Sequence, residues 1–192
     1  MPWEKQFDRD VVLDKAMLAF WQQGYDGTSM KDLINCTGLN PGSIYATFGD
    51  KKNLFCLALE RYESLNRIVL ADYENRLSPR EAILEVFHRM ISDVRNDPAR
   101  GACFLINSVI EIAPKDDKIA RAAEAALTAF EGYFRRMITA GQQQGDINPA
   151  VDSRKTARIL LGLVVGGRVL GRSHLDDAAL SDYLEQADRL LS

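Results

Sequence analysis

The chain has 192 residues, of which 46% are hydrophobic and 27% are charged. At about 150 residues per domain, this length suits one domain or two small ones that share a core, and the composition is globular. The formal net charge of −3 excludes a polycationic coat for nucleic acid but not a local basic face. The longest uncharged apolar run, residues 159–167, is far shorter than the ~20 residues needed to cross a bilayer, and the N-terminus has no apolar signal segment. We therefore expect a cytoplasmic protein without a membrane partner.

Few residues could hold a metal or act as a nucleophile. Cys36, Cys56 and Cys103 form an odd, widely spaced set without a CxxC pair, which is typical of neither a disulfide framework nor a zinc ribbon. The chain has only two histidines. We recognise no nucleophile with its base. A phosphate-binding glycine loop is not indicated either, because the glycines of residues 162–171 fall inside a predicted helix. We expect no metal, no cofactor and no enzymatic activity.

The periodicity of the apolar residues predicts an all-α fold, because they recur at helical spacing and strand-like alternation is missing. The predicted helices cover, in chain order, residues 8–23, a short segment capped by Thr28 or Ser29 and ending before Gly38, and residues 41–48, 51–73, 79–96, 103–113, 116–144, 153–171 and 177–191. The start at residue 79 is marked by Ser78-Pro79-Arg80-Glu81, which combines a Ser N-cap, a Pro at the first helical position and a Glu three residues after the cap.

Residues 28–52 have the organisation of a helix-turn-helix that reads DNA. The turn contains Gly38, which can adopt the left-handed conformation of a sharp turn. Hydroxyl and amide groups suit contacts with phosphates and base edges, and short side chains allow close approach to a major groove. The residues expected to face solvent are Asn40, Ser43, Tyr45, Ala46 and Thr47. The spacing alone fits an αα-corner without a ligand equally well.

The segment from Thr28 to Leu54, TSMKDLINCTGLNPGSIYATFGDKKNL, resembles the DNA-binding signature of TetR-type transcriptional repressors. The resemblance is specific over about residues 8–60, and beyond residue 60 only the helical outline and the length agree. It implies an Ω-shaped, all-helical homodimer that binds a palindromic operator in double-stranded DNA and releases it when a small-molecule ligand binds. It also implies a helix-turn-helix DNA-binding domain over residues 1–50 and a ligand-sensing and dimerisation domain over residues 51–192.

The resemblance further implies which residues contact DNA. They belong to the first helix of the motif, to the recognition helix and to the start of the connecting helix, where the helix dipole also favours a phosphate. The expected contacts are Thr28, Lys31, Asn40, Pro41, Gly42, Ser43, Tyr45, Thr47 and Lys51.

The sequence departs from the family pattern in two ways. Thr47 replaces a more usual aromatic residue or histidine, which removes bulk from one phosphate contact but keeps a donor. Residues 1–55 hold six Lys/Arg and seven Asp/Glu, a net charge of −1, whereas residues 28–52 alone come to +1. Because each lost phosphate contact lowers the salt slope by about 0.9, we expect weak binding in physiological salt unless the dimer engages a good site.

The C-terminal part carries aromatic residues interleaved with polar ones, which could line a ligand site. The candidates are Phe87, Ile91, Phe104, Asn107, Ser108, Glu111, Phe130 and Phe134. Ordinary core packing explains the aromatic residues at least as well. An internal hydrogen bond or solvent exposure would equally satisfy the polar ones.

Cys103 is a candidate thiol sensor. It stands near the start of a predicted helix, whose dipole would lower a thiol pKa, and Arg100 is three residues away. The local stretch Gly101-Ala102-Cys103 is similar to one found in some TetR-like electrophile or oxidant sensors. A structural role is the competing interpretation, since cysteine is among the most buried residue types.

The last two predicted helices are apolar over more than one face, so they need cover on all sides. Gly162, Gly166 and Gly167 would allow close helix approach, which suits a two-fold four-helix interface between subunits. The candidate interface residues are Leu161, Val165, Leu184 and Leu191. A central helix inside a monomer is the alternative.

Two classes of function stay open on these grounds. The first is a one-component transcriptional regulator, a repressor in the first instance, that binds double-stranded DNA as a homodimer and responds to an unidentified small ligand or through Cys103. The second is a helical protein-interaction module that has lost DNA binding, which the weak basic face favours.

Overall fold

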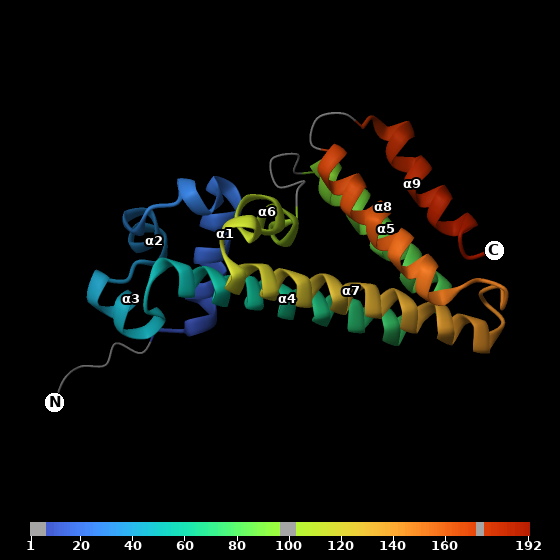
Figure 1. Ribbon diagram of the computed structural model, residues 1–192, viewed down its shortest axis with the longest axis horizontal. Helices are drawn as coiled ribbons and strands as arrows, with labels where there is room; N and C mark the ends of the chain where they lie inside the picture. The colour runs from blue at the N-terminus through green and yellow to red at the C-terminus, as the bar shows by residue number, and fades with distance from the viewer. Residues whose placement is uncertain (1–6, 97–102, 172–174) are drawn as a thin grey trace. The chain divides into compact units, whose positions relative to one another are not determined.

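The computed structural model describes residues 7–96, 103–171 and 175–192. This part of the chain is built from helices and contains no strand, which confirms the predicted all-α class (Figure 1). The elements are α1 (Arg9–Gly27), α2 (Met30–Thr37), α3 (Pro41–Phe48), α4 (Lys51–Arg76), α5 (Pro79–Asn96), α6 (Phe104–Glu111), the short 3₁₀ helix η1 (Ala113–Lys115), α7 (Asp117–Gln144), α8 (Ser153–Leu170) and α9 (Asp177–Arg189).

The chain divides into two compact units. The first comprises Met1–Leu65 and Asn107–Ala123, so it joins α1 to α3 and the first part of α4 to most of α6, η1 and the beginning of α7. The second comprises Asn66–Ile106 and Glu124–Ser192, which hold α5, α8, α9 and the remainders of α4 and α7. The long helices α4 and α7 therefore contribute to both units.

Helix starts lie where local capping chemistry places them. Asp8, Asn40 and Asp152 each accept a backbone N–H of the first turn of α1, α3 and α8. Ser29 and Asp32 form a complete capping box at the start of α2. The predicted box before α5 is also present, because the Ser78 N–H donates to Glu81 and the Glu81 N–H donates to the Ser78 hydroxyl.

Helix α1 is interrupted at Gly24, the residue directly after the helix predicted over residues 8–23. Gly24 has φ 75° and ψ 170°, which are non-helical values inside the span of α1. Only glycine adopts a positive φ of this kind at little cost. The short segment after Gly24 leads into Thr28 and α2, so this bend sets where the helix-turn-helix begins.

The core of the first unit is aromatic and aliphatic. Phe20 packs edge-on against Phe55 with ring centroids 5.0 Å apart. Leu33 of α2 and Ile44 and Phe48 of α3 are fully buried. Burial of these apolar side chains holds the short helices α2 and α3, which would not be stable alone at this length.

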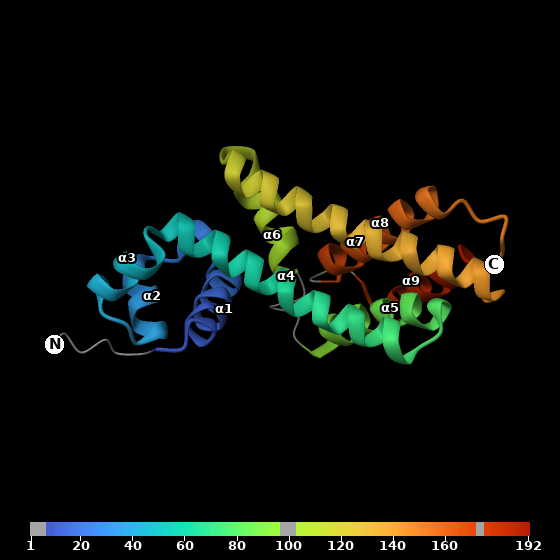
Figure 2. The same ribbon diagram turned by 90° about the horizontal axis from the view of Figure 1, so that it is seen from below.

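The second unit has its own hydrophobic core, in which α5, α8 and α9 pack against one another (Figure 2). Helices α5 and α8 approach closely at Gly167, where an added Cβ would lie only 2.5 Å from the Met90 sulfur. The missing side chain of this glycine makes room for Met90. The close approach predicted for this glycine thus serves packing within the chain. At Gly162, by contrast, a Cβ would meet nothing within 4 Å.

None of the helices in the described part of the chain is long and apolar enough to span a membrane.

Candidate nucleic-acid interface

The segment α2–turn–α3 has the local geometry of a helix-turn-helix. Gly38 ends α2 in the left-handed conformation, with φ 75° and ψ 9°, and its N–H donates to the Ile34 carbonyl at 3.0 Å. Asn40 then caps α3 by accepting the Ser43 N–H at 2.8 Å, and Pro41 occupies the first turn. These local interactions fix both the sharp turn and the direction of α3.

Helix α3 has one buried and one exposed face. Ile44 and Phe48 have no exposed surface, whereas Tyr45 is 52% exposed. Asn40, Ala46 and Thr47 are also exposed, as predicted, whereas Ser43, predicted to face solvent, is half-buried. Pro41 and Gly42 are exposed as well. The side-chain oxygen of Asn40 accepts the cap hydrogen bond, and its amide NH₂ can donate to a ligand.

Two other predicted contacts lie beside the motif. Lys31 is exposed on α2. Thr28 is fully buried, and its hydroxyl donates to the Gly24 carbonyl at 2.6 Å. The structure therefore corrects the expectation for Thr28: its side chain ties the end of α1 to the start of α2 and presents no surface to DNA.

Two neighbouring lysines open α4 and differ in their partners. The ammonium group of Lys51 lies 4.4 Å from the ring centroid of Tyr25. Lys52 forms an ion pair with Asp116, and this hydrogen bond holds the pKa of Asp116 below its usual range and raises the pKa of Lys52. The charge of Lys52 is thus compensated by a carboxylate, whereas Lys51 faces an uncharged ring.

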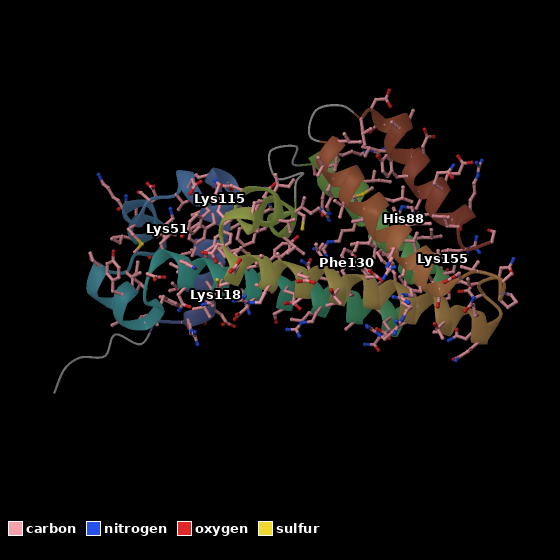
Figure 3. The ribbon with its side chains drawn as sticks, in the orientation of Figure 1. Lys51, His88, Lys115, Lys118, Phe130 and Lys155 are labelled. Carbon is pink, nitrogen blue, oxygen red and sulfur yellow. The ribbon has the colours of Figure 1, made fainter. Side chains whose placement is uncertain are left out.

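Chain segment 107–123 docks on the helix-turn-helix domain through polar contacts. The carboxylate of Glu111 accepts the N–H groups of Tyr25 at 3.3 Å and Asp26 at 3.1 Å. Lys115 pairs with Asp26 at 3.4 Å, and the Lys118 ammonium donates to the Asn53 side chain at 3.0 Å. Figure 3 labels Lys51, Lys115 and Lys118, all on elements of the first unit.

Sequence reasoning missed this role of Glu111. It was predicted to line a ligand site, but both carboxylate oxygens bind the bend that follows Gly24. The two segments lie more than 80 residues apart in the chain, so no local pattern links them. A polar residue at the end of a short apolar helix was the only available signal.

The other candidate ligand residues divide between the two units. Phe87, Ile91, Phe104, Phe130 and Phe134 belong to the second unit, whereas Asn107 and Ser108 belong to the first. The rings of Phe130 and Phe134 are stacked at 5.1 Å, and Phe87 lies 6.4 Å from Phe134. Of these three rings only Phe130 is partly exposed.

Cys36, Cys56 and Cys103, all among the described residues, form no disulfide. Cys103 is buried, with 8% of its surface exposed, directly before α6. Its predicted neighbours Arg100, Gly101 and Ala102 lie outside the described residues. Burial raises the pKa of the Cys36 and Cys56 thiols, which is the behaviour of structural cysteines.

The candidate dimer residues lie on α8, on α9 and at the chain end. Leu161, Val165 and Leu184 are half-buried, and Ile159, on another side of α8, is 49% exposed. Leu191 is fully buried in the core of the second unit. The structure therefore removes Leu191 from the expected interface, because a side chain without exposed surface cannot contact a partner.

The fold and the exposed face of α3 define an all-helical protein with an N-terminal helix-turn-helix and a larger helical C-terminal part. Residues 12–56 match the family model described as bacterial regulatory proteins, tetR family. Residues 79–187 match the model described as tetracyclin repressor-like, C-terminal domain. The chain belongs to the TetR family and is a DNA-binding transcriptional regulator.

Relatives and solved structures agree with this assignment. The chain is 31% identical to the HTH-type transcriptional repressor ComR of Escherichia coli, over 97% of this chain and 89% of that protein. It is 35% identical to the uncharacterized HTH-type transcriptional regulator YezE of Bacillus subtilis, over 75% of each. A solved structure of the TetR family regulator CifR, a cysteine mutant complexed with 26bp double-strand operator DNA, superposes with a TM-score of 0.84 at 26% identity and covers 98% of each chain.

Proposed function

We propose that this protein is a ligand-responsive repressor that binds a palindromic operator as a homodimer. The observation that carries the proposal is the exposed polar face of α3. The opposite face of this helix is apolar and fully buried, and the Gly38 turn and the Asn40 cap fix the direction of the helix. The relative ComR is named a repressor, and the similar CifR structure contains operator DNA.

In this proposal α3 enters the major groove and the flanking residues bind phosphates. The exposed side chains on α2 and α3 would supply the base-edge and backbone contacts, and Lys51 would bind a phosphate at the start of α4. The proposed DNA-contacting residues are Lys31, Asn40, Pro41, Gly42, Ser43, Tyr45, Thr47 and Lys51.

The proposed two-fold interface uses the apolar surface of α8. The partly exposed Leu161 and Val165, with Leu184 of α9, would pack against the same residues of a second copy. DNA half-sites in successive major grooves are about 34 Å apart, so a ligand that changes the separation of the two α3 helices would release the operator.

We propose that the ligand is largely apolar and binds beside Phe130. This ring is partly exposed and stacks on Phe134, which is buried among the aromatic side chains of the second unit. Aromatic and aliphatic side chains line most small-molecule sites. The family is one of transcriptional regulators, which speaks against an enzyme acting on this ligand.

The first experiment selects bound DNA from a random duplex pool and titrates the selected sequence against salt. We expect a palindrome, bound with a slope of log affinity against log salt of about −0.9 for each phosphate contact. Lys31→Ala should flatten this slope, whereas Lys155→Ala on α8, which is 81% exposed, should leave it unchanged.

The two lysine variants separate the proposal from general electrostatics. Both remove one exposed positive charge from the same chain, and only the first removes it from the helix-turn-helix. If the pool yields no enriched sequence, or if both variants change the slope equally, the operator-binding proposal fails and a helical interaction module becomes the better account.

A further inference from the structure

We propose that Tyr25 positions the Lys51 ammonium and that Glu111 holds Tyr25 in place, so that a residue of α6 governs a DNA-phosphate contact. The inference rests on the proposed function in one respect, the binding of a phosphate by Lys51. The positioning itself rests only on contacts within the first unit.

Lys51 is held without being neutralised. Its ammonium lies 4.4 Å from the ring centroid of Tyr25, and within the part of the chain that the structure describes it has no carboxylate partner. An aromatic face attracts a cation through its quadrupole and leaves the net charge intact. The adjacent Lys52 is instead paired with Asp116. Lys51 is therefore the cation at this helix start that is both fixed and available to a phosphate.

Tyr25 is fixed from two sides. Its ring stacks on Phe20 at 6.1 Å and meets Phe55 edge-on at 5.1 Å. Its backbone N–H donates to the Glu111 carboxylate at 3.3 Å, and the same carboxylate accepts the next N–H along the chain. A charged acceptor forms stronger hydrogen bonds than a neutral one. The bend that carries the ring is thus closed by a carboxylate from α6.

Glycine at position 24 makes this closure possible. A Cβ there would lie 3.0 Å from each carboxylate oxygen of Glu111, and the φ of +75° disfavours any other residue. The carboxylate therefore sits directly against the backbone at Gly24. A displacement of Glu111 would free the two N–H groups, loosen the bend and move the Tyr25 ring away from Lys51.

A double-mutant cycle on operator affinity tests this chain of contacts. Glu111→Gln keeps the size of the side chain but leaves one oxygen and no charge, so we expect operator binding about two- to fivefold weaker per half-site, as for a lost cation–π contact. The effect should vanish in a Lys51→Met background and persist in a Lys52→Met background. Equal effects of Glu111→Gln in both backgrounds would overturn the proposal.

Substitutions at the ring and at Lys115 supply the matched controls. Tyr25→Phe retains the aromatic face and should bind as the wild type does, whereas Tyr25→Leu should reproduce Glu111→Gln. Lys115→Gln removes the exposed contact of the same segment with Asp26 and should change affinity little. A Lys115→Gln effect as large as that of Glu111→Gln would show that the whole segment acts, against a specific role of Tyr25.

A second readout needs no DNA. Protons on the Lys51 side chain above the Tyr25 ring should show an upfield ring-current shift in the NMR spectrum of the free protein. The shift should be lost in Tyr25→Leu and reduced in Glu111→Gln, with helical content and the unfolding temperature measured for every variant. An unchanged shift in folded Glu111→Gln refutes the positioning role, whereas wild-type protein that binds no operator refutes the proposed function separately.

Discussion

At the scale of single residues, position in the motif and position in the structure can differ. Thr28 stands at a family DNA-contact position, yet its hydroxyl donates to the Gly24 carbonyl and its surface is buried. Sequence spacing finds the motif, but it does not tell which members of the motif turn inward. That choice depends on the bend at Gly24, which the sequence marks only as the end of a helix.

The buried hydroxyl gives a prediction about stability. Thr28→Val keeps the branched shape and removes the donor, so the free energy of unfolding should fall by about 0.5–1.5 kcal/mol, the typical net value of an intramolecular hydrogen bond. Denaturant titration measures this loss. Thr28→Ser, which keeps the hydroxyl, should retain more of the hydrogen-bond contribution.

Operator affinity separates the two roles of Thr28. If the residue is structural, the folded Thr28→Val variant should show the salt slope of the wild type. A slope reduced by one phosphate contact, with unchanged stability, would restore Thr28 to the DNA-contacting set.

At the scale of helices, local patterns predicted most boundaries because capping acts within three or four residues. Asn40, Asp152 and Ser78 each start a helix where the sequence placed one. Tertiary partners were harder to foresee. An apolar helix face gives the same sequence pattern whether the same chain or a second subunit covers it. For this reason Leu191 was predicted at a subunit interface, although it lies in the core. Glu111 shows the same limit for a polar residue, since its partners are distant in the chain.

The packing of α5 on α8 predicts opposite effects for two glycine substitutions. Gly167→Ala places a methyl group 2.5 Å from the Met90 sulfur, so it should lower the free energy of unfolding by about 1–3 kcal/mol, the usual cost of overpacking. Gly132→Ala on α7 meets only the far end of Arg136 at 3.9 Å and should raise stability by up to about 1 kcal/mol through helix propensity.

Thermal unfolding of both variants checks this pair. Because both introduce the same methyl group into a helix, helix propensity cancels between them and packing decides the difference. Equal shifts of the unfolding temperature would show that Met90 moves aside at no cost.

At the scale of the whole molecule, the proposed repressor depends on a second copy of the chain. The half-buried Leu161 and Val165 are four residues apart on α8 and so lie on one face of the helix. An isologous interface repeats every substitution on both sides of the two-fold axis. A charge placed in such a face is therefore introduced twice into the same interface.

Leu161→Glu combined with Val165→Glu should dissociate the dimer. Sedimentation velocity should show a monomer at concentrations where the wild type is dimeric, because four carboxylates would otherwise be buried together. Ile68→Glu, on α4 at a side chain that is 63% exposed, is the matched control and should leave the dimer intact. A double variant that stays dimeric would place the interface elsewhere.

The bend at Gly24 also bears on how this protein can change during evolution. Position 24 must lack a side chain because its backbone is left-handed and because the Glu111 carboxylate fills the adjacent space. Shortening residue 111 would relieve only the second constraint. Glycine is therefore required at position 24 whatever residue stands at position 111, because the positive φ remains when the carboxylate is gone. A substitution at residue 111 would thus change the support of the bend without lifting the requirement for glycine.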